Sequence, residues 1–245
     1  MIKNNTQTLV LIKPDALKNS LTGYILSQLS EFHTGLRFCG LKVVQVNKIL
    51  ASEHYAEHKG KVFYEPLLEY IMGIAHYPDN PEKRRVIAIV YQGVDAVKKI
   101  REIVGNTDPH KAREERPGSI RSLGTIVPIK NDKNEVIGSR IDNLIHASSS
   151  DTEAEREIKL WFKPNDIPPL LQPYPTCTVN NHYYYKNHQI MTNYEPGSIC
   201  ICAPGDQVWE TDLQVLKAIV NNEKPIYSLE SVVAKYLIND LQNFE

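Results

Sequence analysis

The segment Thr8-Leu9-Val10-Leu11-Ile12-Lys13-Pro14-Asp15 decides how the fold begins, because an unbroken apolar run ends abruptly in a charged turn that contains proline. A short run of this kind is typical of a buried strand. Apolar residues then recur at helical spacing until Gly35, at Leu17, Leu21, Ile25 and Leu29. The sequence therefore predicts a strand that leads directly into a helix.

Two more strands and two helices follow in the next seventy or so residues. Residues 36–50 are rich in β-branched and apolar side chains, which predicts a long strand, and Ser52 is the expected N-cap of a short helix. Residues 86–91 form a compact apolar run typical of a buried strand. Asp95 is expected to cap a helix that ends at Gly105.

The last elements of this region surround a histidine. A polar loop is expected over residues 106–124, and Asn143-Leu144-Ile145 reads as a short strand leading into His146. Ser150-Asp151-Thr152-Glu153 has the pattern of a capping box that opens a helix. Because two adjacent strands lie between strand–helix units, we predict an α+β fold, a ferredoxin-like βαββαβ antiparallel sheet sandwich with surface helices.

Composition points to an ordinary globular protein. Lys and Arg number 28 against 29 Asp and Glu, so no bulk charge favours specific nucleic-acid or membrane binding. No apolar stretch reaches the roughly 18 residues of a membrane span, and Met1 to Thr8 lack a targeting pattern. We expect a cytoplasmic location. Four scattered cysteines predict no structural disulfide.

Proline distribution suggests the domain organisation. Five of the 15 prolines fall between residues 164 and 175, a composition typical of a semi-rigid linker. We therefore expect a first domain over residues 1–165, a Pro-rich linker over 166–181 and a C-terminal extension of unknown role over 182–245. Short strands within 183–192 and 198–202, with an amphipathic helix from Leu229 to Leu241, predict that the extension is a small α+β unit.

The polar loop carries groups suited to phosphate. It contains Arg113-Glu114-Glu115-Arg116-Pro117-Gly118-Ser119-Ile120-Arg121 and is preceded by Arg101 and Thr107. Arginine forks and hydroxyl groups match phosphate oxygens. Taken alone, the loop is better explained as a solvated charged surface. His146, taken alone, is more often a structural histidine than a nucleophile.

Five short segments, taken together in their order along the chain, favour a functional interpretation of these residues. They are Lys13-Pro14-Asp15, His54-Tyr55, Asn106-Thr107-Asp108-Pro109, Pro117-Gly118-Ser119-Ile120-Arg121 and Asn143-Leu144-Ile145-His146-Ala147-Ser148. Together they resemble the signature segments of the nucleoside diphosphate kinase family, over roughly residues 6–163. The resemblance implies the same ferredoxin-like fold and transfer of a terminal phosphate, typically from ATP, to a nucleoside diphosphate.

The resemblance also assigns the reacting group. His146 would carry the phosphoryl group as a phosphohistidine, so the reaction would be ping-pong. Imidazole is substantially neutral and nucleophilic near pH 7, which suits this chemistry. Glu157, eleven residues downstream, would hold the ring by its other nitrogen, and Ser148 would support that carboxylate.

The remaining roles concern the nucleotide. By resemblance Arg101, Thr107 and Arg121 grip the phosphates, as positioning and charge neutralisation require. Lys13 would reach both the ribose hydroxyl and the transferring group, and Tyr55 would lie near the transferred phosphate.

Sugar, base and metal complete the expected site. Asn143 would bond the ribose hydroxyl and Phe63 would stack on the base, which implies broad base tolerance. Mg²⁺ is expected to arrive on the nucleotide phosphates, so no protein residue is assigned as a metal ligand. Asp15 is expected to organise the first turn.

Other histidines and cysteines receive structural interpretations. His54 and His58 lie four residues apart, and a solvated helix face is favoured over a metal site. Cys177, Cys200 and Cys202 fit no zinc spacing, so we favour packing.

The chain departs from the family at the nucleophile and in two loops. Ala147 and Ser149 stand where the family usually has Gly and Asp, which leaves open an alternative, a nucleotide-binding regulatory module with weak or no catalysis. The loops near 74–85 and 122–142 are enlarged, and the second reads as an inserted β-hairpin with strands 125–129 and 136–141. The family resemblance implies a homo-oligomer, with a hexamer favoured and a tetramer or dimer possible.

Overall fold

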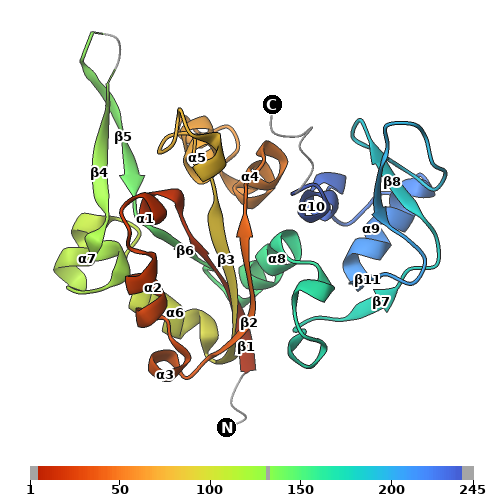
Figure 1. Ribbon diagram of the computed structural model, residues 1–245, viewed down its shortest axis with the longest axis horizontal. Helices are drawn as coiled ribbons and strands as arrows, with labels where there is room; N and C mark the ends of the chain where they lie inside the picture. The colour runs from red at the N-terminus through yellow and green to blue at the C-terminus, as the bar shows by residue number, and fades with distance from the viewer. Residues whose placement is uncertain (1–4, 131–132, 239–245) are drawn as a thin grey trace. The chain divides into compact units, whose positions relative to one another are not determined.

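The computed structural model describes residues 5–130 and 133–238. The chain forms two compact units. The first unit contains residues 1–46 and 60–154, and the second contains residues 47–59 and 155–245. Each unit has its own core, and Figure 1 labels the elements of both.

A four-stranded antiparallel sheet is the centre of the first unit. Its order is β2-β3-β1-β6, and every neighbouring pair is antiparallel. The strands are β1 (Asn5–Ile12), β2 (Arg37–Val44), β3 (Val86–Val94) and β6 (Ile145–Ala147). The first and third strands occupy the middle, as a βαββαβ chain order requires when each helical crossover returns to the same sheet. The predicted ferredoxin-like fold is confirmed.

The link between β1 and β2 is helical but broken. Three short helices replace the predicted single one: α1 (Pro14–Lys18), α2 (Thr22–Gln28) and α3 (Glu31–Thr34). Ser20 adopts a positive φ of 58° between the first two, and the Ser30 hydroxyl accepts the His33 N–H to begin the third. Gly35 ends the last helix with a φ of 63°, a conformation that glycine adopts without strain.

The predicted strand over residues 36–50 was too long. β2 ends at Val44, and the Asn47 side chain accepts the Leu50 N–H at 2.8 Å. Asn47 thus caps α4 (Lys48–His54), and the predicted cap at Ser52 is wrong. Asparagine competes with a continuing strand because its side chain satisfies the first free amides of a helix.

The region between β2 and β6 holds most of the surface helices. These are η1 (Ala56–His58), α5 (Tyr64–Ile71), η2 (Pro81–Lys83), α6 (Ala96–Val104), α7 (Pro109–Glu115) and η3 (Ile120–Leu123). The predicted ends of α6 at Asp95 and Gly105 are confirmed. The loop predicted over residues 106–124 is wrong at α7, where the chain is helical. The Asp108 carboxylate accepts the His110 and Lys111 amides, and Pro109 occupies the first turn of this helix.

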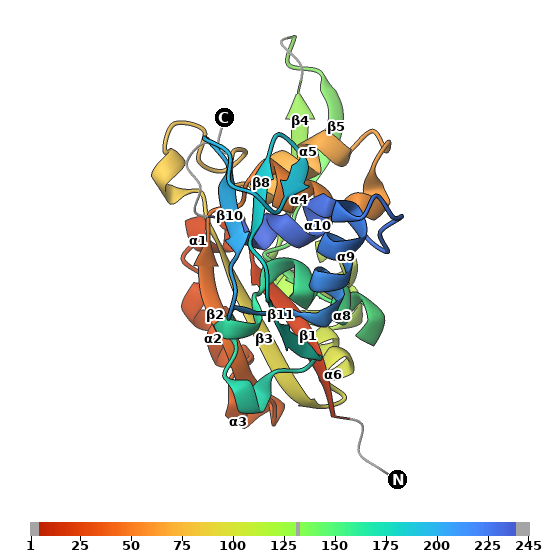
Figure 2. The same cartoon turned by 90° about the vertical axis from the view of Figure 1, so that its right-hand side faces the viewer.

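The inserted hairpin is confirmed. It consists of β4 (Thr125–Lys130) and β5 (Val136–Asp142), paired antiparallel in a separate two-stranded sheet. Figures 1 and 2 both show these two strands running away from the four-stranded sheet of the same unit. β6 begins only at Ile145, because Leu144 is in the left-handed region with a φ of 69°. Asn143 and Leu144 therefore form a turn, where a strand was predicted.

Apolar side chains from the sheet and the helices fill the first core. α6 packs against β1 and β6 and places Ile100 and Val104 in this core, both fully buried. α8 (Asp151–Trp161) opens as predicted, with the Ser150 hydroxyl accepting the Glu153 N–H at 3.2 Å. Burial of apolar side chains is the dominant favourable contribution to folding.

The second unit contains more regular structure than predicted. Besides α4 and most of α8, it contains η4 (Pro164–Asp166), η5 (Pro169–Leu171), β7 (Thr176–Thr178), β8 (Tyr183–Lys186), β9 (Gln189–Met191), β10 (Ile199–Cys202), β11 (Gln207–Trp209), α9 (Glu210–Val220), α10 (Leu229–Val233) and η6 (Ala234–Tyr236). One sheet has the order β10-β8-β9, and β7 pairs with β11. The stretch expected to be a linker therefore carries a paired strand. Figure 2 shows β8 and β10 side by side.

The C-terminal helix is shorter than expected. α10 ends at Val233 and continues as η6, while Leu241 lies outside the described residues. Val232, Val233 and Leu237 fill the core of the second unit with residues of β8 and α9. None of the helices within the described ranges is long and apolar enough to cross a membrane.

Candidate active site

The turn before His146 is tied to the start of α1. The Ile145 N–H donates to the Asn143 carbonyl at 2.7 Å, across the left-handed Leu144. The Asp15 carboxylate accepts the Leu144 N–H at 2.8 Å, and the Lys13 N–H donates to the Leu144 carbonyl at 2.9 Å. The Lys13-Pro14-Asp15 and Asn143-Leu144-Ile145 segments, far apart in sequence, are thus one structural feature. Asp15 has the organising role expected for it.

Lys13 is a buried cation in this turn. Its side chain is only 5% exposed, and its Nζ donates to the Asn143 Oδ1 at 2.7 Å. The Nζ also lies 5.0 Å from the centroid of the Tyr70 ring. Burial, reinforced by the Arg121 charge, lowers the pKa of Lys13 to about 7, although Asp15 and Asp142 oppose the shift.

Arg121 is the second buried cation of the first unit's site. It donates through Nη2 and Nε to the Ile145 carbonyl at 3.1 and 3.3 Å. Its Nη1 reaches the Gly105 carbonyl at 3.1 Å and the Thr107 hydroxyl at 3.3 Å. Arg121 therefore connects the strand that carries His146 to the loop that carries Thr107.

Four of the predicted nucleotide contacts meet here. The Asn143 amide donates to the Thr107 carbonyl at 3.0 Å, which completes a chain of contacts through Lys13, Asn143, Thr107 and Arg121. Two like charges held close together in a buried setting repel each other, and an anion between them would relieve that repulsion. The arrangement is suited to phosphate.

His146 itself lies on the edge strand β6. It pairs with Leu11 of β1 in the sheet register and is partly exposed. Ser148 follows it on the same chain segment and is fully buried, with its hydroxyl 3.0 Å from the Leu9 N–H that it accepts and 3.4 Å from the Leu9 carbonyl. Both hydrogen bonds hold the end of β6 against β1.

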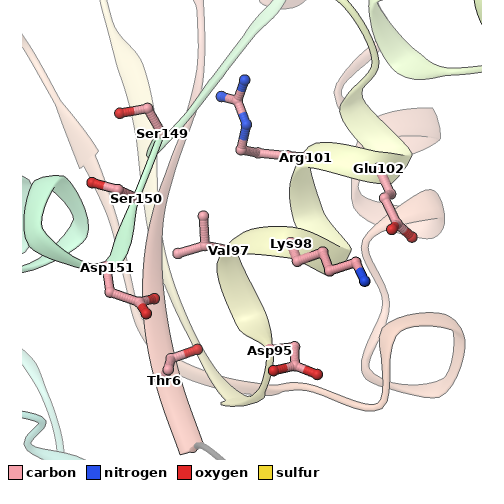
Figure 3. Close-up of a pocket in the computed structure, with 9 residues that line it drawn as sticks. All are labelled: Thr6, Asp95, Val97, Lys98, Arg101, Glu102, Ser149, Ser150 and Asp151. Atoms are coloured by element: carbon pink, nitrogen blue, oxygen red, sulfur yellow. The ribbon is translucent and has the colours of Figure 1, made fainter.

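Arg101 lines a cleft next to this segment. The cleft has a volume of about 550 Å³. Figure 3 shows Arg101 and Lys98 on the α6 wall, with Ser149 and Ser150 on the facing wall. Because Ser149 follows His146 by three residues, the cleft adjoins the strand that carries the predicted nucleophile. Arg101 is exposed, so its guanidinium is accessible to a ligand.

The second unit holds Glu157 and Tyr55. Glu157 is 3% exposed, and its Oε1 lies 4.0 Å from the Nδ1 of His54. His54 accepts the Trp161 indole N–H at 3.3 Å and is buried, so the solvated face predicted for it is wrong. The Tyr55 ring packs edge-on against His54, with ring centroids 4.6 Å apart.

Phe63 precedes α5 in the first unit. Its side chain is 52% exposed, and the Lys61 ammonium lies 5.7 Å from its ring centroid. An exposed aromatic face flanked by a cation is suited to stacking on a nucleotide base.

Sequence reasoning missed three residues around Lys13. Tyr70 packs under its ammonium, while His76 and Asp142 form a buried pair with 2.9 Å between the imidazole Nε2 and the carboxylate. No local sequence pattern marks these residues. Tyr70 lies in α5, His76 and Asp142 lie in the two enlarged loops, and only tertiary contacts bring them to Lys13.

The cationic site is suited to phosphate-bearing ligands, and comparison with known proteins shows the family. The nucleoside diphosphate kinase family model matches residues 6–167. The chain is 34% identical to a nucleoside diphosphate kinase of Thermococcus kodakarensis, over 81% of this chain and 97% of that protein. A Pyrococcus furiosus relative with the same name is 38% identical, over 75% and 95%. The chain belongs to the nucleoside diphosphate kinase family.

Solved structures agree. A nucleoside diphosphate kinase of Halobacterium salinarum in complex with CDP has a TM-score of 0.51 and 32% identity, covering 67% of this chain and 92% of that one. A transition-state mimic of the Borrelia burgdorferi enzyme with bound vanadate and ADP has a TM-score of 0.52 and 28% identity, covering 67% and 90%. The chain is thus an enzyme, a phosphotransferase that acts on nucleotides, and the regulatory-module alternative is not favoured.

Proposed function

We propose that His146 receives the terminal phosphoryl group of a nucleoside triphosphate and passes it to a nucleoside diphosphate. The observation that carries this proposal is the pair of buried cations, Lys13 and Arg121, bonded to both sides of the turn from which β6 and His146 begin. Phosphoryl transfer is catalysed mainly by positioning and by charge neutralisation. This site offers both.

The two half-reactions balance at one atom. In the first, an imidazole nitrogen of His146 bonds to the terminal phosphorus while the bridging P–O bond breaks, and a nucleoside diphosphate leaves. In the second, a terminal oxygen of another diphosphate attacks the phosphorus and the P–N bond breaks. His146 is regenerated without net change.

The buried side chains have separate tasks in this scheme. Arg121 and Thr107 bind the phosphates, and Lys13 neutralises the group in transit. Asn143 bonds the ribose hydroxyl and orients Lys13 through their 2.7 Å contact. Arg101 contributes an exposed charge from the cleft, and Phe63 stacks on the base.

Three further roles rest on the family resemblance. Glu157 orients the imidazole, Ser148 supports that carboxylate, and Tyr55 lies near the transferred phosphate. Burial of Glu157 and Ser148 is consistent with these roles, because an orienting group needs a constrained position.

Magnesium fits the site as a companion of the nucleotide. Lys13, Arg121, Thr107 and Asn143 supply cations, a hydroxyl and an amide, which suit phosphate oxygens better than a metal ion. Both oxygens of Asp142 are bonded to His76 and Arg140, which makes it a poor metal ligand. When bound on the phosphates, Mg²⁺ would neutralise negative charge there.

Steady-state kinetics tests the two-step scheme. With ATP as donor and a second nucleoside diphosphate as acceptor, double-reciprocal plots at several acceptor concentrations should be parallel. Intersecting lines would indicate direct transfer within a ternary complex and contradict the phosphohistidine. Several acceptor bases should be accepted with similar efficiency, because stacking does not depend on base identity.

We propose a homo-oligomer, with a hexamer favoured over a tetramer or dimer, and a cytoplasmic location. Light scattering that gives the 27.9 kDa mass of one chain would contradict the oligomer.

A further inference from the structure

The two enlarged loops of the first unit meet at one buried hydrogen-bonded pair, His76 and Asp142. His76 lies in the loop near 74–85, and Asp142 ends β5 of the inserted hairpin. The His76 Nε2 lies 2.9 Å from the Asp142 Oδ2, and both side chains are more than 90% buried. A buried pair of this kind holds its two segments in one register, since separating it would strand a charge.

Arg140 completes the cluster. Its Nε donates to the Asp142 Oδ1 at 2.6 Å and its Nη2 donates to the Oδ2 at 3.1 Å. The hydrogen bonds from His76 and Arg140 outweigh burial and lower the pKa of Asp142. Asp142 is therefore a carboxylate, which requires His76 to donate its Nε2–H.

This cluster touches the nucleotide site by two routes. Along the chain, Asp142 is followed directly by Asn143, whose side chain contacts Lys13 and the Thr107 carbonyl. Through space, the His76 ring packs on Tyr70 at 5.2 Å, and the Tyr70 ring lies under the Lys13 ammonium at 5.0 Å. A shift of His76 would therefore displace Asn143 and Lys13, the two residues to which we assign contacts with the ribose and the phosphates.

Hydrogen bonds also support the base of the hairpin. The Arg113 guanidinium donates to the Ser122 carbonyl at 2.8 Å and to the Gly124 carbonyl. A Cβ placed on Gly124 would lie 2.6 Å from the Asp142 carbonyl oxygen, so the two strands meet there in close contact. The hairpin thus emerges from a well-supported base, and Asp142 is part of that base.

We propose that His76 and Asp142 are positioning residues for nucleotide binding. Their hydrogen bond anchors the backbone before Asn143, so that Asn143 and Lys13 are preorganised for the ribose and the phosphates. The two enlarged loops would then brace this site, each supplying one partner of the hydrogen bond. This inference rests on the proposed function, because it uses the nucleotide roles of Asn143 and Lys13.

Single-turnover labelling of the full chain tests the proposal. Phosphoenzyme formation is followed with γ-labelled ATP at increasing concentration, which separates the half-saturating concentration from the limiting rate. His76→Ala should raise the half-saturating concentration about tenfold, the scale of one lost charge-assisted hydrogen bond. The limiting rate should stay within about twofold, because His146 is not touched.

Conservative and control variants distinguish positioning from general destabilisation. His76→Gln retains an N–H donor at similar reach and should recover most of the affinity. Glu82→Ala and Ser139→Ala change exposed residues of the same two loops and should behave like wild type. If His76→Ala does not fold, His76→Gln and Asp142→Asn carry the test, and Asp142→Asn should weaken ATP binding more than His76→Gln.

Each outcome decides one question. An unchanged half-saturating concentration in folded His76→Ala would overturn the positioning role, as would an equal loss in Glu82→Ala. A lower limiting rate with unchanged half-saturation would overturn it too. Absence of label on the wild-type protein would instead refute the proposed phosphohistidine.

Discussion

The Nζ of Lys13 donates to the side-chain carbonyl of Asn143 at 2.7 Å, across 130 residues of chain. This contact joins the turn after the first strand to the turn before the last strand of the sheet. It brings a cation and an amide to the strand that begins with Ile145 and His146.

Nucleotide binding should weaken as pH rises through about 7. Lys13 binds phosphate as a cation, and its pKa of about 7 in the free protein means that the charge is lost above that pH. Nucleotide binding restores the proton at a cost that grows with pH. The Kd for ADP, measured by calorimetry from pH 6 to 9, should rise about tenfold.

Lys13→Arg is the control for this pH dependence. Arginine stays charged over the whole range, so its Kd should be nearly flat with pH even if its absolute affinity is lower. A wild-type Kd that does not change between pH 6 and 9 would show that Lys13 does not lose its proton within this pH range. An equal slope in Lys13→Arg would assign the dependence to another group.

Replacing Arg121 should lower the stability of the protein much more than replacing Arg101. Arg121→Ala leaves the Ile145 and Gly105 carbonyls without the donor they have now and should lower the free energy of unfolding by about 3 kcal/mol. Arg101→Ala removes an exposed side chain and should change it by less than about 0.5 kcal/mol. Both should weaken ADP binding.

Urea unfolding of the two arginine variants, paired with calorimetric titration of ADP, measures both quantities. Similar stability losses in the two variants would contradict the structural role of Arg121. Unchanged ADP affinity in Arg101→Ala would remove Arg101 from the nucleotide site.

The Asp15 carboxylate should stabilise the fold by accepting the Leu144 N–H. Asp15→Ala leaves the N–H of the left-handed Leu144 unsatisfied and buried, which should cost about 2 kcal/mol. Asp15→Asn keeps an acceptor and should cost less than about 1 kcal/mol. Thermal unfolding of both variants is the measurement, and equal losses would mean that the hydrogen bond to Leu144 is not the cause.

The second unit contains a buried ion pair that predicts a non-additive response. The Lys235 Nζ lies 3.0 Å from the Asp212 Oδ2, with burial raising the pKa of Asp212 and lowering the pKa of Lys235. Lys235→Met strands the carboxylate and should cost about 3 to 5 kcal/mol, whereas Lys235→Met with Asp212→Leu should be near neutral. Additive losses in chemical denaturation would contradict this coupling.

The sequence predicted the sheet, the hairpin and α8 well because their signals are local. The apolar run from Thr8 and the capping pattern at Ser150 each act within a few residues. It failed where a polar side chain decides between two local structures. Asn47 ends a promising strand and Asp108 starts a helix in an apparent loop, and neither preference is visible from hydrophobic periodicity.

In the candidate site too, residues in local motifs were predicted, and residues defined by tertiary contacts were not. Lys13, Thr107, Arg121 and Asn143 were found from motifs, and the structure joins them by hydrogen bonds. His54 was wrongly given a solvated face, because its burial depends on Trp161, 107 residues away. The pair of His76 and Asp142 carries no motif and becomes visible only when both loops are folded.

Phosphate transfer from γ-labelled ATP to the protein tests the central claim most directly. Wild type and the exposed-histidine control His110→Ala should each acquire an acid-labile, base-stable phosphate that fragmentation maps to His146. Addition of a nucleoside diphosphate should discharge it with formation of the labelled triphosphate. His146→Ala should acquire none while still binding ADP. Stable label on His146→Ala, or wild-type turnover without any phosphoenzyme, would contradict the account.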